Sequence, residues 1–181
     1  MDMPEMPACL IAVDEIYAIV RRLSMEITTY YRHCPQELVV VGLLKGSFIF
    51  MADLVRQIEL PLVVDFLGAS SYGESAASSG QVRLTMDLAT NIAGRDVLLV
   101  EDIVDTGITI EAVRRLLERR QPRSIKVCSF LSKPACRRVN VHVDFIGKEI
   151  DNAFVVGYGL DYAQNFRNLP FVGKIELSGK R

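Results

Sequence analysis

The most chemically distinctive segment of the chain is acidic and lies where a predicted buried strand ends. Residues 97–109 read Val-Leu-Leu-Val-Glu-Asp-Ile-Val-Asp-Thr-Gly-Ile-Thr, so Glu101 and Asp102 follow an apolar run and Asp105 comes three residues later. A Thr-Gly turn then opens a predicted helix. The N–H groups of a first helical turn attract anions, and a glycine in the turn lets a phosphate reach the backbone. We therefore expect an anion site at this turn.

The acidic side chains suit a second part of the same ligand. Glu101 and Asp102 can accept hydrogen bonds from the two hydroxyls of a sugar or hold a divalent cation, which leaves Asp105 free for proton transfer. A phosphate beside a diol describes a phosphorylated ribose. Two other interpretations exist. Simple helix capping needs only one carboxylate, and the Asp-Thr-Gly of an aspartic protease leads into further strand rather than into a helix.

Composition narrows the class of protein. The 21 Lys and Arg residues against 22 Asp and Glu give a formal charge of −1, so the chain lacks the global positive field that nucleic acids or anionic membranes would require. The longest apolar run, Leu38–Leu44, is far shorter than the roughly 20 residues that span a bilayer. Four scattered cysteines without a C-x-x-C motif indicate free thiols. We expect a cytoplasmic soluble protein that binds neither nucleic acid nor membrane.

The hydrophobic pattern predicts the elements that position the acidic segment. A helix capped by Asp14 and ended by Pro35 would bury Ile16, Val20, Leu23, Ile27 and Tyr30. Further helices are predicted from Ser47 to about Glu59 and after Gly107, and residues 68–80 read as a loop. Strands are predicted over residues 38–44, 61–67, 82–86 (antiparallel to the strand before it), 96–100, 125–131, 141–146 and 154–156. The alternation favours one α/β domain over residues 1–181, a mainly parallel twisted sheet flanked by helices. Such sheets bind ligands at the carboxyl ends of their strands.

Residues 97–109 also resemble the phosphoribosyl-diphosphate motif of the type I phosphoribosyltransferases. Four further segments resemble, in order and spacing, the hypoxanthine-guanine branch of that family: Gly42–Phe48, Ser70–Gly73, Lys133 and Phe154–Tyr162. The resemblance covers roughly residues 38 to 177. It implies the type I fold, with a small base-binding hood to which the C-terminal part contributes and a flexible lid at about residues 68–80. It also implies a homodimer or homotetramer.

The resemblance implies an activity as well. Members of the family act in purine salvage: with Mg²⁺, they transfer ribosyl 5-phosphate from 5-phosphoribosyl 1-diphosphate to hypoxanthine or guanine. The products are IMP or GMP and pyrophosphate, and the transition state resembles an oxocarbenium ion. Catalysis would then come mainly from alignment and placed charges. The alternatives are a non-catalytic regulator of the same fold that binds the diphosphate, and a transferase for a different base.

Roles for individual residues follow from the same resemblance. Asp105 is the implied general acid/base for the proton on the purine's imidazole ring, and a cis peptide bond is implied between Leu44 and Lys45. By the same resemblance, the 5-phosphate would be bound by Asp105, Thr106, Gly107, Ile108 and Thr109, and the pyrophosphate by Lys45, Gly46 and Arg167. The ribose and the metal would be held by Glu101 and Asp102, with Asp161 as a further metal ligand. The base would be bound by Lys133, Phe154 and Val155, and the lid would contain Ser71 and Tyr72. Ile108 replaces a residue that is often polar in relatives. The Lys133 ammonium has donors only, so it favours a purine oxo group over an amino group.

Overall fold

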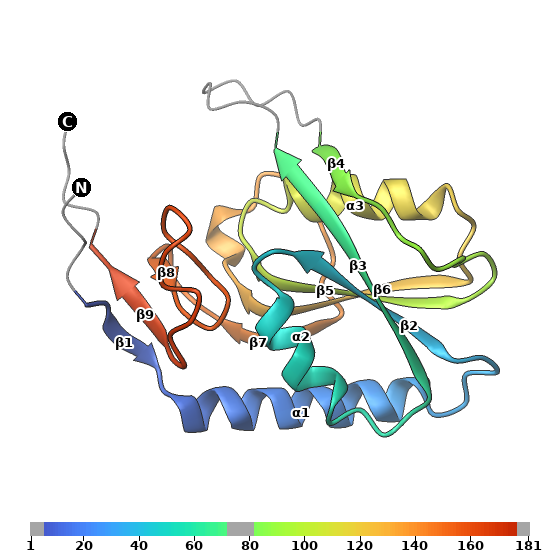
Figure 1. Cartoon of the computed structure of the whole chain (residues 1–181), viewed down its shortest axis with the longest axis horizontal. Coiled ribbons are helices and arrows are strands. Elements are labelled where there is room, and N and C mark those ends of the chain that lie inside the picture. Colours follow the sequence, from blue (N-terminus) through green and yellow to red (C-terminus); the bar gives the residue numbers. More distant parts are fainter. Residues whose placement is uncertain (1–5, 72–81, 177–181) are drawn as a thin grey trace.

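The computed structural model describes residues 6–71 and 82–176 (Figure 1). Its elements are β1 (Ala8–Ile11), α1 (Val13–Tyr31), β2 (Leu38–Leu44), α2 (Phe48–Val55), β3 (Leu62–Ser71), β4 (Val82–Met86), β5 (Asp96–Val104), α3 (Ile108–Glu118), β6 (Ser124–Ser132), the 3-10 turn η1 (Pro134–Cys136), β7 (Phe145–Glu149), β8 (Phe154–Val156) and β9 (Val172–Ile175). They form a six-stranded sheet in the order β4-β3-β2-β5-β6-β7 and a separate sheet in the order β1-β9-β8.

The large sheet is parallel from β3 to β7, and only β4 runs antiparallel to its neighbour. Both features agree with the prediction. The central strands β2 and β5 are apolar throughout their paired region, for example where Val41 faces Leu99. Continuous apolar strands of this kind are stable only when both faces of the sheet are covered. Because β5 is parallel to β2 and β6, its acidic carboxyl end lies at the same end of the sheet as theirs.

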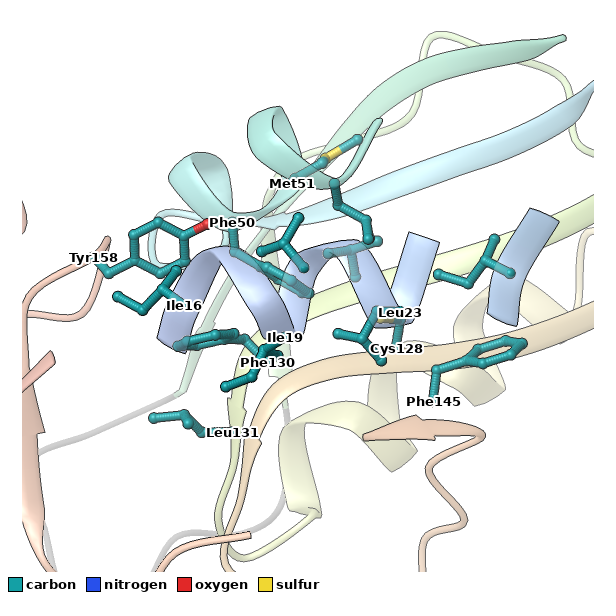
Figure 2. Close-up of a cluster of buried hydrophobic side chains, with 14 of the residues drawn as sticks. Ile16, Ile19, Leu23, Phe50, Met51, Cys128, Phe130, Leu131, Phe145 and Tyr158 are labelled. Carbon is teal, nitrogen blue, oxygen red and sulfur yellow. The ribbon is translucent and has the colours of Figure 1, made fainter. Parts of the chain in front are cut away.

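Successive residues of the central strands enter two different cores. Val40, Leu98 and Phe130 pack with the helices α1 and α2, whereas residues of the opposite parity pack with Ile110, Val113 and Leu117 of α3. Helices α1 and α2 therefore cover one face of the sheet and α3 covers the other (Figure 1). Figure 2 shows Ile16, Ile19 and Leu23 of α1 lying beside Phe130 and Cys128 of β6.

Three details of the predicted helices are wrong. Helix α1 begins at Val13 after the N-cap Ala12, so Asp14 lies in the first turn and is not the cap. Tyr30 is 57% exposed, and Tyr31 is buried in its place because it continues the four-residue spacing from Ile27. Helix α2 ends at Val55 rather than near Glu59.

The ends of three strands near the candidate site differ from the prediction. Strand β5 continues to Val104 instead of ending at residue 100. Strand β3 continues to Ser71 because residues 68–71 pair with β4, so the predicted loop does not begin at residue 68. Strand β7 begins at Phe145, not at 141, because Val141 packs against the turn at Gly107 instead of joining the sheet.

The three-stranded sheet of β1, β9 and β8 is called the hood below, after the small hood that the family resemblance implies. Strands β8 and β9 come from the C-terminal part, as expected, and β1 from the N-terminal part adds a third strand that the sequence did not indicate. The hood lies at the left of Figure 1, on the side of the large sheet where β2 ends. Within the described residues, none of the helices has the length and apolar character needed to cross a membrane.

Candidate active site

The predicted phosphate turn connects β5 to α3. Gly107 is the residue preceding the helix and has a φ of 81°, in the left-handed region that favours glycine. A Cβ there would also overlap the side chains of Val139 and Val141. The first helical hydrogen bond runs from the Glu111 N–H to the Gly107 carbonyl at 3.0 Å. The N–H groups before Glu111 have no acceptor within the helix, so this turn can donate several hydrogen bonds to an anion.

Asp105 and Lys133 lie together although 28 residues separate them. Strands β5 and β6 are adjacent and parallel, so both residues leave the sheet at the same edge. The Lys133 Nζ lies 3.3 Å from Asp105 Oδ2, with 8% of the Lys133 side chain and 45% of the Asp105 side chain exposed. The Lys133 backbone N–H donates to the Val104 carbonyl at 3.0 Å. An exposed carboxylate is thus held beside a buried cation, an arrangement suited to proton transfer next to a hydrogen-bond donor.

Glu101 and Asp102 form the most strongly perturbed pair of carboxyl groups in the site. Glu101 is buried, and its Oε2 has no hydrogen-bond partner in the described part of the chain. Burial, followed by the nearby charge of Asp102, holds the pKa of Glu101 well above its usual range. Burial also raises the pKa of Asp102 to about 6, although backbone hydrogen bonds and the cation of Arg167 oppose that rise. Hydroxyl donors or a cation beside these two carboxyl groups would stabilise their charged forms, which burial disfavours.

The loop after β2 contacts the Asp102 carboxylate. The peptide bond between Leu44 and Lys45 is cis, as the family resemblance implied. Gly46 follows, and a Cβ on Gly46 would overlap the carboxylate of Asp102. On its other side, a Cβ on Gly159 would overlap the Gly46 carbonyl, and Gly159 itself has a φ of 101°. Three segments far apart in the sequence therefore meet at Gly46, and glycine is the residue that allows it.

A second group of predicted residues is joined by a side chain that the sequence did not single out. The Arg167 guanidinium lies 2.7 Å from Asp161 Oδ1 and donates to the Gly159 carbonyl at 2.7 Å. The Gln164 amide oxygen lies 3.4 Å from both the Lys45 ammonium and Arg167 Nη2. Gln164 thus connects the two predicted pyrophosphate cations. In the sequence, only its position between Asp161 and Arg167 could have indicated that Gln164 belongs to this group.

The predicted base-binding residues Phe154 and Val155 lie on β8 in the hood. Val155 is buried and pairs with Lys174 of β9, whereas Phe154 is 37% exposed. The ring of Phe154 meets Tyr162 edge to face, with ring centroids 5.6 Å apart. The exposed Phe154 ring can stack with a planar ligand.

The remaining predictions concern the lid, Ile108 and Thr109, and the metal. Ser71 is the last residue of β3, and Tyr72 lies outside the described residues, as does most of the predicted lid. Ile108 and Thr109 form the first turn of α3. Within residues 6–71 and 82–176, no three His, Cys, Asp or Glu side chains cluster as a complete metal site. The all-β fold of an aspartic protease is excluded, since a helix follows the Asp-Thr-Gly turn.

Comparisons with known proteins agree with this arrangement. Residues 12–163 match the model of the phosphoribosyl transferase domain. The chain is 49% identical over 163 residues to a hypoxanthine phosphoribosyltransferase of Salmonella typhimurium, covering 90% of this chain and 92% of the relative. It is 44% identical to a hypoxanthine-guanine phosphoribosyltransferase of Bacillus subtilis, covering 92% of each.

A solved structure shares the whole architecture. The crystal structure of a hypoxanthine-guanine phosphoribosyltransferase from Bacillus anthracis superposes with a TM-score of 0.89 at 37% identity, covering 95% of this chain and 100% of that one. The mixed sheet and the helices on its two faces are therefore those of the type I fold. The chain belongs to the phosphoribosyltransferase family, among the hypoxanthine phosphoribosyltransferases.

Proposed function

We propose that this enzyme transfers ribosyl 5-phosphate from 5-phosphoribosyl 1-diphosphate to hypoxanthine or guanine. The bond from C1 of the ribose to the diphosphate breaks, a bond from C1 to the purine nitrogen forms, and pyrophosphate leaves. The observation that carries the proposal is that Lys133 Nζ lies 3.3 Å from Asp105 Oδ2, where Asp105 is the first residue of the Asp-Thr-Gly turn. This arrangement supports the proposal, because a donor for the purine, an acid/base group and an anion site would then lie next to one another.

The phosphate and ribose ends of the substrate would be held by β5 and the turn after it. The turn at Thr106, Gly107, Ile108 and Thr109, together with the Asp105 backbone, would bind the 5-phosphate through N–H groups and hydroxyls. Because N–H groups can make these contacts, Ile108 is compatible with the role. Glu101 and Asp102 would accept hydrogen bonds from the ribose hydroxyls. A hydroxyl would thus give Glu101 Oε2 a partner, which it does not have among the described residues.

The pyrophosphate end would be held by the residues that converge on Gly46. Lys45 and Arg167 provide two cations joined through Gln164, and Gly46 exposes backbone at the point where the loop after β2 passes Asp102. Binding by two cations favours the diphosphate as a leaving group because its negative charge increases as the bond to C1 breaks. The residues are thus arranged to stabilise charge that develops in the reaction.

The site also fits Mg²⁺. The donor set consists of hard carboxylate oxygens on Glu101, Asp102 and Asp161, and one buried oxygen of Glu101 has no partner among the described residues. Because these carboxylates do not form a cluster of three, a metal here would take most of its ligands from the substrate's own oxygens and from water. When bound, Mg²⁺ would neutralise charge on the diphosphate.

The purine would lie between the hood and the end of β6. The exposed Phe154 ring would stack on the base, the Val155 backbone would meet its edge, and Lys133 would donate to the oxygen at position six. Asp105 would accept the proton that the imidazole ring loses as the bond to C1 forms, and would then release it to solvent. An ammonium cannot accept a hydrogen bond from the amino group of adenine, so the site favours oxopurines.

The experiment is a transfer assay with hypoxanthine, guanine, xanthine and adenine, each supplied with 5-phosphoribosyl 1-diphosphate and Mg²⁺. We expect the oxopurines hypoxanthine and guanine to be converted in preference to adenine, and Asp105→Asn to lower kcat by about 100-fold or more while donor binding, followed by calorimetry, is retained. The exposed Asp151→Asn is the matched control. Donor binding without any nucleotide product would indicate a regulator instead, and better use of adenine would indicate a transferase for another base.

Two further properties belong to the proposal. We expect a homodimer or homotetramer, which exposed apolar side chains such as Phe48 and Val64 support, and light scattering after gel filtration checks it. We also expect the enzyme to work in the cytoplasm, because all four cysteines are free thiols, Cys128 among them deeply buried.

A further inference from the structure

Arg137 makes three hydrogen bonds at the centre of the candidate active site. It follows η1 and comes four residues after Lys133. Its Nη1 donates to the carbonyl oxygens of Val104 and of Asp105, the latter at 2.6 Å. Its Nη2 donates to the hydroxyl of the buried Ser132 at 2.9 Å. One guanidinium therefore contacts the end of β5 and the end of β6 at the same time.

These contacts are to the residues that carry the proposed chemistry. The Asp105 carbonyl belongs to the proposed acid/base residue itself, and Ser132 directly precedes the lysine proposed to recognise the purine. A guanidinium is planar, and its N–H groups have fixed directions. The guanidinium therefore limits how far the two strand ends can move relative to each other, and with them Asp105 and Lys133.

The phosphate half of the turn is held in a different way. The Thr106 carbonyl accepts from the backbone N–H groups of Arg138 and Val139 at 3.0 and 3.3 Å. Neither bond uses the Arg137 side chain. Removing the guanidinium should therefore disturb the base-recognition half of the site while the phosphate half keeps its support.

We propose that Arg137 is a positioning residue that sets the distance between the acid/base carboxylate of Asp105 and the purine-recognising ammonium of Lys133. The proposal rests on the proposed function. It assigns Arg137 no contact with substrate. This role explains why the Arg137 guanidinium donates to two main-chain carbonyls and a hydroxyl and not to a carboxylate.

The test compares Arg137→Ala with Arg138→Ala. Arg138 is the exposed neighbour, and its side chain makes no hydrogen bond or ion pair within the described residues. We expect Arg137→Ala to lower kcat/KM for hypoxanthine by about 100-fold, the effect of roughly an ångström of misplacement. The KM for 5-phosphoribosyl 1-diphosphate should change less than about threefold, and selectivity against adenine should fall. Added guanidinium ion, well below denaturing concentrations, should restore part of the activity with hypoxanthine.

A crystal structure of Arg137→Ala gives a reading that does not depend on turnover. We expect the separation of Lys133 Nζ and Asp105 Oδ2 to exceed about 4 Å, beyond an ion pair, whereas Arg138→Ala keeps it. If the pair stays closed, or if both KM values rise together without guanidinium rescue, Arg137 has only a structural role and the proposal is overturned. Failure of the wild type to make nucleotide overturns the proposed function instead, and the crystallographic comparison then still decides whether Arg137 holds the pair.

Discussion

The carboxylate of Asp102 lies against the Cα of Gly46, in the space that a Cβ would fill on any other residue. This contact joins the end of β5, which would hold the ribose, to the loop after β2, which would hold the pyrophosphate. The two ends of one substrate are therefore bound by elements that touch each other. A change at Gly46 should move both subsites.

We expect Gly46→Ala to lower kcat/KM for 5-phosphoribosyl 1-diphosphate by about 100-fold, because the methyl group must push Asp102 or the loop out of position. Steady-state kinetics with the diphosphate varied measures this. Gly94→Ala is the control: Gly94 has a positive φ of 71°, unlike Gly46, and none of the described residues lies within 4 Å of the position that its Cβ would take. It should lose stability without losing activity. Equal kinetic losses in the two variants would contradict the assigned contact.

The raised pKa of Asp102 predicts a dependence of stability on pH. Burial raises that pKa from 3.8 to about 6, so between these values the unfolded chain releases a proton that the folded chain keeps. The free energy of unfolding should therefore fall as pH rises through this window, and the raised pKa of Glu101 acts in the same direction.

Urea unfolding at pH 4 and pH 7.5 measures this effect. We expect Asp102→Asn to be more stable than the wild type at pH 7.5 by about 1 to 3 kcal/mol and to differ less at pH 4. The exposed Asp151→Asn should follow the wild type at both pH values. A wild-type protein that gains stability across this window relative to Asp102→Asn would contradict the assigned pKa.

The sequence was sufficient to predict the central strands and their parallel arrangement. Long apolar runs identified β2, β5 and β6. The parallel pairing of β5 and β6 brings Asp105 and Lys133 together across 28 residues, but only the family resemblance singled out Lys133 in the sequence. The turn at Thr106 and Gly107 could also be predicted from the sequence, and Gly107 has the positive φ that the turn requires. These features depend on local composition and on one topological rule.

Other parts depend on contacts that local patterns do not contain. Strand β1 has only four residues and pairs with β9 at the opposite end of the chain, so no periodicity revealed it. Gln164 reaches Lys45 from a segment with several positive φ values at non-glycine residues, a conformation that its composition did not indicate. The start of α1 at Val13 occurs without a side-chain cap, so the capping signal at Asp14 was misleading.

Lys133 provides a test of base selectivity. Its side chain is buried and its ammonium faces Asp105, so replacing it with glutamine removes the charge and adds a group that can both donate and accept. We expect Lys133→Gln to lower kcat/KM for hypoxanthine by about 100-fold and that for adenine by much less. Competition between the two bases in one reaction measures the ratio. Lys126, which pairs with Asp144 at the other end of β6, offers Lys126→Gln as a control with unchanged selectivity. An unchanged ratio in Lys133→Gln would remove Lys133 from the base site.

Gln164 tests whether the two cations of the pyrophosphate subsite are held together by one side chain. Its amide oxygen lies 3.4 Å from both Lys45 and Arg167, so its loss should leave the lysine without its partner in this site. We expect Gln164→Leu to weaken pyrophosphate binding by about 3- to 10-fold, the effect of losing hydrogen bonds to charged groups. The shorter amide in Gln164→Asn suits a positive φ but cannot reach as far, so it should weaken binding while preserving the backbone. Calorimetric titration with pyrophosphate and Mg²⁺ measures both. If leucine weakens binding and asparagine does not, the backbone at residue 164 needs a polar side chain, and the bridge between the cations is not what holds pyrophosphate.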